Sequence, residues 1–201
     1  MTETTQRPGG TRSPGRPRSE KAEKAIIEAT LDLLAEESGV AGVSIEAVAA
    51  RAGAGKTTIY RRWSNKEALI VDALASVKAP LTRPAGESVR EDLLAIARSM
   101  RSERHRQHAK CFWNVVGSAE KHPELYARYR EHVIEPRREI MREVLRRGVE
   151  RGEVRADLDL EVAIAMLTGS MSTKTPQDEL PADYPDTVVE VLLRGIATDA
   201  G

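Results

Sequence analysis

The stretch ARAGAGKTTIY, residues 50–60, decides how this chain folds. Counted from Ala50, residues Gly55, Lys56 and Thr57 nearly reproduce the Gly-x-x-x-x-Gly-Lys-Ser/Thr loop that cradles phosphates in nucleotide hydrolases. Further on, the segment 69–72, LIVD, imitates the apolar run and aspartate that hold the metal ion in such enzymes. The pattern of the surrounding residues must therefore decide between a phosphate loop and another structure.

The residues before the glycines have the spacing of a helix. A phosphate loop follows a buried strand, whereas Ile45, Val48, Ala49 and Ala52 recur at i, i+3, i+4 and i+7. Ser44 precedes them as a candidate N-cap, because its hydroxyl oxygen can accept from the first free backbone N–H groups. This spacing favours a helix over 44–51 and disfavours the nucleotide-binding alternative.

A second helix start follows the glycines. Ser64-Asn65-Lys66-Glu67 forms a capping box, which opens a helix that absorbs Asp72 on one face. Since no strand is predicted on either side, no parallel sheet would aim a phosphate loop.

The resulting layout is that of a helix-turn-helix, with helices over 44–51 and 55–63 and a turn at 52–54. Ile59 and Trp63, four residues apart, are predicted to lie in the core. All charged residues between Arg51 and Lys66 are basic, which suits a polyanion, although a solvated basic face is the alternative. The exposed positions of the second helix are expected to carry Lys56, Thr57, Thr58, Tyr60, Arg61 and Arg62.

The net charge of zero hides a concentration of basic residues toward the N-terminal end. Residues 1–18 contain too few apolar side chains to order themselves, and a first helix is expected from Ser19 to Gly39. Within this basic arm, Gly15-Arg16-Pro17 and Arg18 are candidates for insertion into a narrow minor groove of DNA. A merely solvated tail is the alternative.

Residues 19–75 resemble the DNA-binding domain of the TetR family of transcriptional regulators. The resemblance rests on the stretch 26–74, with Gly53, Lys56, Thr58 and Tyr60 as its core, followed by an aromatic residue at 63 and the segment NKEAL. One departure is Gly55, where the family usually has Ser or Thr as the N-cap of the recognition helix.

The resemblance implies double-stranded DNA as a partner and assigns roles to single residues. Lys56, Tyr60 and Lys66 would contact backbone phosphates, and Ser44 would add a phosphate contact at its helix N-terminus. Candidates for the groove are Thr57, Thr58, Arg61 and Arg62, because guanidinium groups grip guanine and Thr methyl groups meet thymine.

The second half of the chain is also predicted to be helical. After a linker at 78–87, Ser88-Val89-Arg90-Glu91 forms a capping box, and further helices are expected at 107–119, 123–151, 159–173 and 185–198. Pro136 is expected to kink or split the long one, and the charges from 137 to 153 are interpreted as a solvated face. The predicted domains are a basic arm (1–18), a three-helix DNA-binding domain (19–79) and an effector-binding and dimerisation domain (80–201).

Two kinds of site are expected in this second domain. The segment 160–171 is apolar on nearly all sides. The resemblance implies that helices 159–173 and 185–198 form a homodimer interface. For helix 159–173, the alternative is a buried core helix. The interface candidates are Leu160, Ile164, Leu167, Met171, Val188 and Leu192. The resemblance also implies a pocket for a small-molecule effector, for which ordinary core packing is the alternative, with the candidates Met100, Phe112, Trp113, Val116, Tyr126, Tyr129 and Met166.

Other functions find little support. No secretion signal or membrane-spanning run is apparent, so we expect a soluble cytoplasmic protein without a membrane partner. The single Cys111 allows neither an internal disulfide nor a zinc knuckle, and the spacing of His105, His108 and Cys111 lacks an acidic ligand to complete a metal site. No constellation supports catalysis, a metal or a cofactor.

The sequence therefore predicts an all-α, dimeric, ligand-responsive DNA-binding regulator. We expect a repressor that binds a palindromic operator and is released by an effector. The alternatives are a nucleotide-binding enzyme and a non-specific architectural DNA-binding protein.

Overall fold

The structure, a computed structural model, describes residues 16–36, 38–78, 80, 83–101, 107–172 and 180–196. Within these ranges every regular element is helical, which confirms the all-α fold class. In chain order the elements are α1 (Arg16–Ala35), the 3₁₀ turn η1 (Gly39–Gly42), α2 (Ile45–Ala52), α3 (Lys56–Tyr60), α4 (Lys66–Ser76), α5 (Val89–Ser99), α7 (Ala109–Gly117), α8 (Pro123–Tyr129), the π-helical segment η2 (Arg130–Ile134), α9 (Glu135–Glu150), α10 (Leu160–Met171) and α11 (Tyr184–Ile196).

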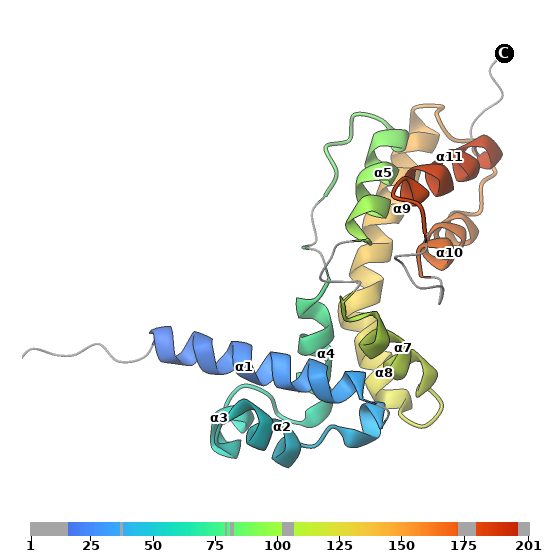
Figure 1. The fold of residues 1–201 in the computed structure, drawn as a ribbon. Helices are drawn as coiled ribbons and strands as arrows, with labels where there is room; N and C mark the ends of the chain where they lie inside the picture. Colours follow the sequence, from blue (N-terminus) through green and yellow to red (C-terminus); the bar gives the residue numbers. More distant parts are fainter. Residues whose placement is uncertain are drawn as a thin grey trace, which may run out of the picture.

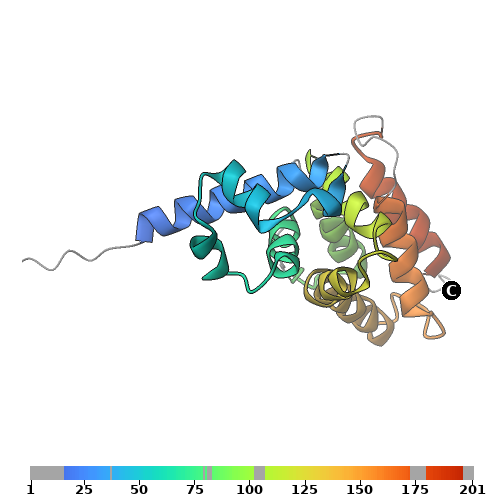
Figure 2. The same ribbon diagram turned by 90° about the horizontal axis from the view of Figure 1, so that it is seen from below.

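The helices form two bodies that meet at an angle (Figure 1). One body contains α1 to α4, with α2 and α3 below α1, and the other contains α5, α10, α11 and most of α9. The helices α7 and α8 lie where the two bodies meet. Seen from below, α10 and α11 lie side by side at the end of the molecule away from the start of α1 (Figure 2).

The first helix is longer at its N-terminus than expected. It begins at Arg16 rather than Ser19 and ends at Ala35 rather than Gly39. Ile26, Leu33 and Leu34 are buried along one face, as their helical spacing predicts. The residues before Arg16, which include most of the predicted arm, lie outside the described part of the chain.

The glycines of the opening stretch form the turn of a helix-turn-helix. The Ser44 hydroxyl accepts a hydrogen bond from the backbone N–H of Ala47 (3.1 Å), which caps α2 as expected. At the other end, Gly53 adopts a left-handed conformation (φ 60°), and Ala54 N–H donates to the carbonyl of Ala49 (3.0 Å). Because the element before the glycines is a helix, the phosphate-loop alternative is wrong.

The next helix begins one residue later than the predicted capping box implies. Asn65 rather than Ser64 is the N-cap of α4, and its side-chain oxygen accepts from Ala68 N–H (2.9 Å). Asp72 lies on one face of α4, as expected, and accepts a hydrogen bond from the indole Nε1 of Trp63 (2.8 Å). This bond ties the end of the helix-turn-helix to α4.

The predicted N-cap at Ser88 is confirmed. Ser88 caps α5 and accepts from Glu91 N–H (3.1 Å). The buried Asp92 then accepts from the backbone N–H of Gly86 (3.0 Å) and pairs with Arg147 (2.8 Å). These contacts fix the end of the linker against α9.

The long predicted helix is divided just before Pro136, as expected, into α8, η2 and α9. Proline lacks an N–H and its ring clashes with the carbonyl four residues earlier, so a regular α-helical turn cannot continue through it. The chain instead widens into η2 just before Glu135 and Pro136, and α9 continues from there.

The two hydrophobic cores do not divide at residue 79. The first core contains the buried side chains of α1 to α4, but also Cys111, Leu125, Tyr129 and Val133. The Cys111 thiol donates to the carbonyl of Leu31 (3.2 Å), and the side-chain amide of Asn114 donates to that of Leu34 (2.6 Å). The helices α7 and α8 therefore pack with the helix-turn-helix body, while α5, α10, α11 and most of α9 form the second core.

Candidate DNA-binding surface and effector cavity

The outer surface of α3 presents polar and basic side chains above a buried floor. Ile59 and Trp63 lie in the core, as predicted. Because α3 is anchored from below, Lys56, Thr57, Tyr60 and Arg61 are exposed. More than half of the Tyr60 surface (53%) is accessible.

Lys56 is paired within this surface. Its ammonium group donates to the carboxylate of Glu46 on α2 (2.6 Å), and both side chains are exposed. This hydrogen bond raises the pKa of Lys56 and lowers that of Glu46. Since exposed pairs are weak, Lys56 can exchange Glu46 for a phosphate at little cost.

The prediction that Arg62 is exposed is wrong. Its guanidinium Nε donates to Glu23 of α1 (3.0 Å), and only 19% of its side chain is accessible. Arg62 lies two residues after the end of α3, and its pair with Glu23 holds it against α1. Thr58 is also half-buried.

The remaining predicted DNA contacts flank α3. Ser44 and Lys66 are half-buried at the first turns of α2 and α4. Arg16 and Arg18 lie in the first turn of α1, and their side chains lie outside the described part of the structure. The Gly55 N-cap of α3 makes no side-chain capping bond.

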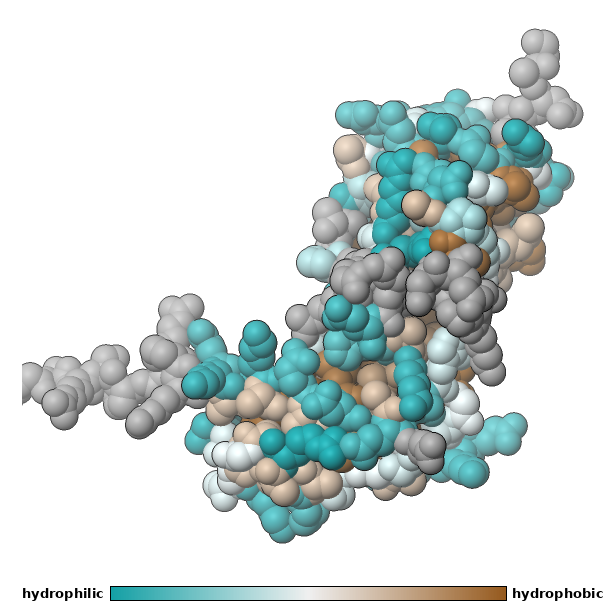
Figure 3. Space-filling view, in the orientation of Figure 1, coloured by the Kyte–Doolittle hydropathy of each residue, from teal (hydrophilic) through white to brown (hydrophobic). Residues whose placement is uncertain are grey.

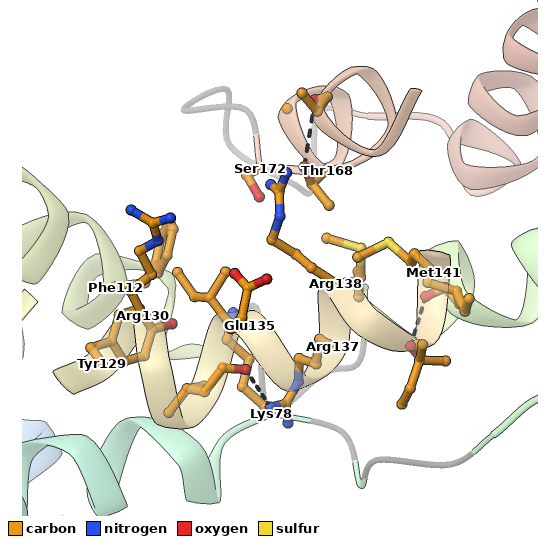
Figure 4. A pocket seen from close by; sticks show the side chains of 18 of the residues that line it. Lys78, Phe112, Tyr129, Arg130, Glu135, Arg137, Arg138, Met141, Thr168 and Ser172 are labelled. Atoms are coloured by element: carbon orange, nitrogen blue, oxygen red, sulfur yellow. Dashed lines mark hydrogen bonds between the residues drawn. The ribbon is translucent and has the colours of Figure 1, made fainter. Parts of the chain in front are cut away.

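A cavity of about 590 Å³ lies where the two bodies meet. Its walls come from the end of α4, from α5, α7 and α8, from η2 and α9, and from α10 (Figure 4). The volume falls in the range of roughly 300–1,000 Å³ that is common for small-molecule sites.

Four of the seven predicted pocket residues line this cavity: Met100, Phe112, Tyr126 and Tyr129. Trp113 and Val116 lie outside its lining, and Trp113 instead packs edge-on against the Phe112 ring (5.0 Å between centroids). The prediction that Met166 lines the pocket is wrong, because this side chain is 55% exposed on the outer face of α10. Its neighbour Ala165 lines the cavity instead, one residue earlier along the helix.

The charged lining was missed by the sequence interpretation. Among the described residues, five cationic side chains and two carboxylates line the cavity, and several of them come from the segment interpreted as a solvated face. The cations are Lys78, Arg130, Arg137, Arg138 and Arg142, and the carboxylates are Glu135 and Glu161.

The two carboxylates are held by neighbouring arginines. Arg142 pairs with Glu135 (2.6 Å) and Glu161 (2.5 Å), and Arg138 also pairs with Glu161 (2.6 Å). These guanidinium groups lower the pKa of Glu161 to about 2, chiefly through the hydrogen bond from Arg142. The α10 side of the cavity is thus internally neutralised.

On the opposite side of the cavity lie a lysine and a buried tyrosine. The Lys78 ammonium lies 4.9 Å from the centre of the Phe112 ring. Burial, and then the nearby charge of Arg137, lower the pKa of Lys78 to about 8. Tyr129 is fully buried, its hydroxyl has no hydrogen-bond partner among the described residues, and burial raises its pKa.

Most predicted interface residues lie in the protomer's own core. Ile164, Leu167, Met171 and Leu192 are buried there, and Leu160 and Val188 are half-buried against it. The exposed apolar side chains of α10 and α11 are Val162 (53%), Met166 (55%) and Val191 (62%). Figure 3 shows apolar surface on the side where these two helices lie.

Among the residues that the structure describes, no group of three or more His, Cys, Asp or Glu side chains could hold a metal ion. His105, one of the three residues considered for a metal, lies outside them. None of the helices in the described ranges has the length and apolarity needed to span a bilayer.

Comparison with known proteins agrees with this geometry. Residues 26–73 match the family model of bacterial regulatory proteins of the tetR family, and residues 83–192 match the tetracyclin repressor-like C-terminal domain. The chain is 32% identical to the HTH-type transcriptional regulator YdeS of Bacillus subtilis, over 92% of this chain and 96% of that protein. It is also 32% identical to the DNA-binding transcriptional repressor TetR of Mycobacteroides abscessus, over 88% and 96% respectively. The crystal structure of the TetR family transcription regulator SCO0332 superposes with a TM-score of 0.60 at 29% identity, covering 89% of this chain and all (100%) of that one.

The fold and the α3 surface define a helix-turn-helix DNA-binding protein with a separate ligand cavity. More specifically, the chain belongs to the TetR family and is a ligand-responsive, DNA-binding transcriptional repressor. The family consists of transcriptional regulators rather than enzymes.

Proposed function

We propose that the protein acts as a homodimer that occupies a palindromic operator through α3 and leaves it when a small molecule fills the cavity at the junction of the two bodies. The observation that carries this proposal is the exposed surface of α3, with Lys56, Thr57, Tyr60 and Arg61 held above Ile59 and Trp63. Such a regulator works in the cytoplasm and needs no catalytic chemistry.

The proposed DNA contacts are of two kinds: some position the protein on the phosphate backbone, and others read the base sequence. Lys56, Tyr60 and Lys66 bind backbone phosphates, with Ser44 adding a contact at the start of α2. Thr57 and Arg61 lie on the exposed face of α3 and read base edges, because guanidinium and Thr methyl groups match guanine and thymine. The half-buried Thr58 contributes at the rim of this surface.

Arg62 contributes to DNA binding indirectly. Its ion pair with Glu23 joins the end of the recognition helix to α1, so it holds α3 in place. We expect Arg16 and Arg18, near the start of the same helix, to bind in the adjacent minor groove.

The dimer forms through the exposed apolar faces of α10 and α11. Val162, Met166 and Val191 are uncovered in a single protomer, and apolar patches of this kind mark interaction surfaces. A dimer would place two copies of α3 about one DNA turn apart, which matches a palindrome.

A charged substitution in this apolar surface tests the proposed interface. Val191→Glu should give monomers in size-exclusion chromatography with light scattering, whereas Ala127→Glu, on the exposed face of α8, should leave the dimer intact. Dimers that persist in the Val191→Glu variant at low micromolar concentration would contradict this interface.

The cavity can influence α3 through α4. This helix packs against α1, α8 and η2, and the chain enters the cavity wall directly after its end, at Lys78. An effector releases the operator only if it binds the DNA-incompetent conformation more tightly; equal affinity for both conformations would change nothing.

Site-directed variants test the assignment of DNA contacts. Lys56→Ala should weaken binding to all sequences about equally. It should also reduce the slope of log affinity against log salt concentration by about one, which corresponds to the loss of one phosphate contact. Arg61→Ala should relax the sequence preference at one position of each half-site, with a loss of about 1–3 kcal/mol there. The reverse assignment, with Lys56→Ala altering the preferred sequence, would refute these roles.

A further inference from the structure

The cavity has an uneven distribution of charge and apolar surface, which restricts what it can bind. On the α10 side, Arg138 and Arg142 are engaged by Glu135 and Glu161. On the other side, Lys78 lines the cavity directly after α4, and neither of these carboxylates pairs with it. Among the described residues that line the cavity, cationic side chains outnumber carboxylates.

Three polar groups converge on this second side. Figure 4 shows Lys78 and Arg137 next to each other at the base of the cavity, with Tyr129 and Phe112 on the adjoining wall. Within the described chain, the Lys78 ammonium makes neither a hydrogen bond nor an ion pair, and it lies over the face of the Phe112 ring. Arg137 donates to the carbonyl of Val133 (2.8 Å), and it lies beside Lys78 (Figure 4).

Tyr129 adds an unsatisfied donor. Its side chain is fully buried, and its hydroxyl finds no acceptor among the described residues. A buried polar group without a partner is costly, so a ligand that accepts a hydrogen bond from it gains affinity. The same ligand oxygen would also compensate the charge of Lys78.

The rest of the wall is apolar. It is formed by aliphatic and thioether side chains that offer no hydrogen bonds: Ile96, Met100, Val133, Ile134, Ile140 and Met141. A fully hydrated inorganic anion would leave this wall unused, whereas a hydrocarbon body would cover it.

We propose that the cavity selects an organic anion with an apolar body, whose carboxylate or equivalent group binds Lys78, Arg137 and the Tyr129 hydroxyl. This inference rests on the proposed function, since it names the chemical class of the effector. It also places the anionic group against the first residues after α4, where its charge can draw Lys78 toward the cavity.

The test compares three probes with the same ten-carbon chain, below their micelle concentrations. Isothermal titration calorimetry measures the affinity of the dimer for sodium decanoate, 1-decanol and decyltrimethylammonium bromide. Decanoate should bind at least about tenfold more tightly than either of the others, as expected for a charge-assisted site in a poorly solvated cavity.

Variants then locate the selectivity. Lys78→Met should reduce the preference for decanoate over decanol to about threefold or less, and Tyr129→Phe should weaken decanoate binding by about fivefold or more. Lys78→Arg should keep the preference, and Lys121→Met, an exposed lysine between α7 and α8, should leave it unchanged. Thermal unfolding confirms that each variant is folded.

Equal or tighter binding of decanol or the quaternary ammonium by the wild-type protein would overturn the inference without relying on any variant. Failure of all three probes to bind, or a decanoate preference that survives in a folded Lys78→Met protein, would overturn it as well. The same preparations are titrated into operator DNA without ligand. Sequence-specific binding there supports the proposed function whichever class of ligand the cavity prefers.

Discussion

Gly53, at the end of α2, makes a quantitative prediction about the turn of the helix-turn-helix. Its φ of 60° lies in the left-handed region, where a Cβ atom costs roughly 1–2 kcal/mol. A Cβ added there would meet nothing within 4 Å, so no clash adds to this cost. Alanine also restricts the unfolded chain, which offsets about 0.4–1 kcal/mol. Gly53→Ala should therefore destabilise the protein by about 1 kcal/mol.

Gly55 provides the matched comparison within the same turn. Its backbone is extended (φ −74°, ψ 143°), and no neighbouring atom lies within 4 Å of an added Cβ. Because Gly55 is the N-cap of α3 without a side-chain bond, Gly55→Ser should stabilise the protein by about 0.5 kcal/mol.

Urea unfolding followed by far-ultraviolet circular dichroism, at one fixed protomer concentration, measures both changes. The change at Gly53 should also lower the melting temperature by about 2–4 °C. A Gly53→Ala variant as stable as the wild-type protein would refute the left-handed turn, and with it the placement of α3.

Three further predictions concern the second body and the cavity. Asp92→Asn should lower the free energy of unfolding by about 2 kcal/mol in a urea titration, because it leaves Arg147 without its buried carboxylate partner. Asp186→Asn, at an exposed ion pair, should cost less. Equal losses in the two variants would contradict this difference in burial. Gly148→Ala should destabilise by about 1–2 kcal/mol in the same assay, because its Cβ would lie 2.3 Å from a valine methyl group, and an unchanged stability would refute this close packing. Raising the pH from about 7 to about 9 should weaken decanoate binding about tenfold in calorimetry. In the ligand-free protein Lys78, with its pKa near 8, loses its proton over this range, while Arg137 keeps its own. An affinity that does not change with pH would argue against Lys78 as the anchor.

Local features of the fold were predictable from the sequence. The caps at Ser44 and Ser88 and the burial of Ile59 and Trp63 depend on residues within one or two turns, so spacing alone indicates them. The turn at Gly53 and the family resemblance follow from the same short segment. The class of protein was therefore readable before its structure.

Features that depend on contacts between distant segments were not predictable. Arg62 is drawn away from the recognition surface by Glu23, which lies on another helix. In α10, apolar residues surround the helix, so periodicity could not tell that Ile164 faces the protomer core while Met166 faces outward. Lys78 belonged to a predicted linker, and only the packing of α7 and α9 against it makes it part of a cavity.

The central claim is that α3 reads a palindromic sequence as part of a dimer. The most direct measurement is selection of bound duplexes from a random pool by the purified protein, followed by footprinting of the selected site. We predict one palindromic footprint whose half-sites are centred about one helical turn, roughly 10 base pairs, or a small multiple of it apart. Equal affinity for selected and random duplexes at the same salt concentration would contradict the claim and indicate a non-specific DNA-binding protein.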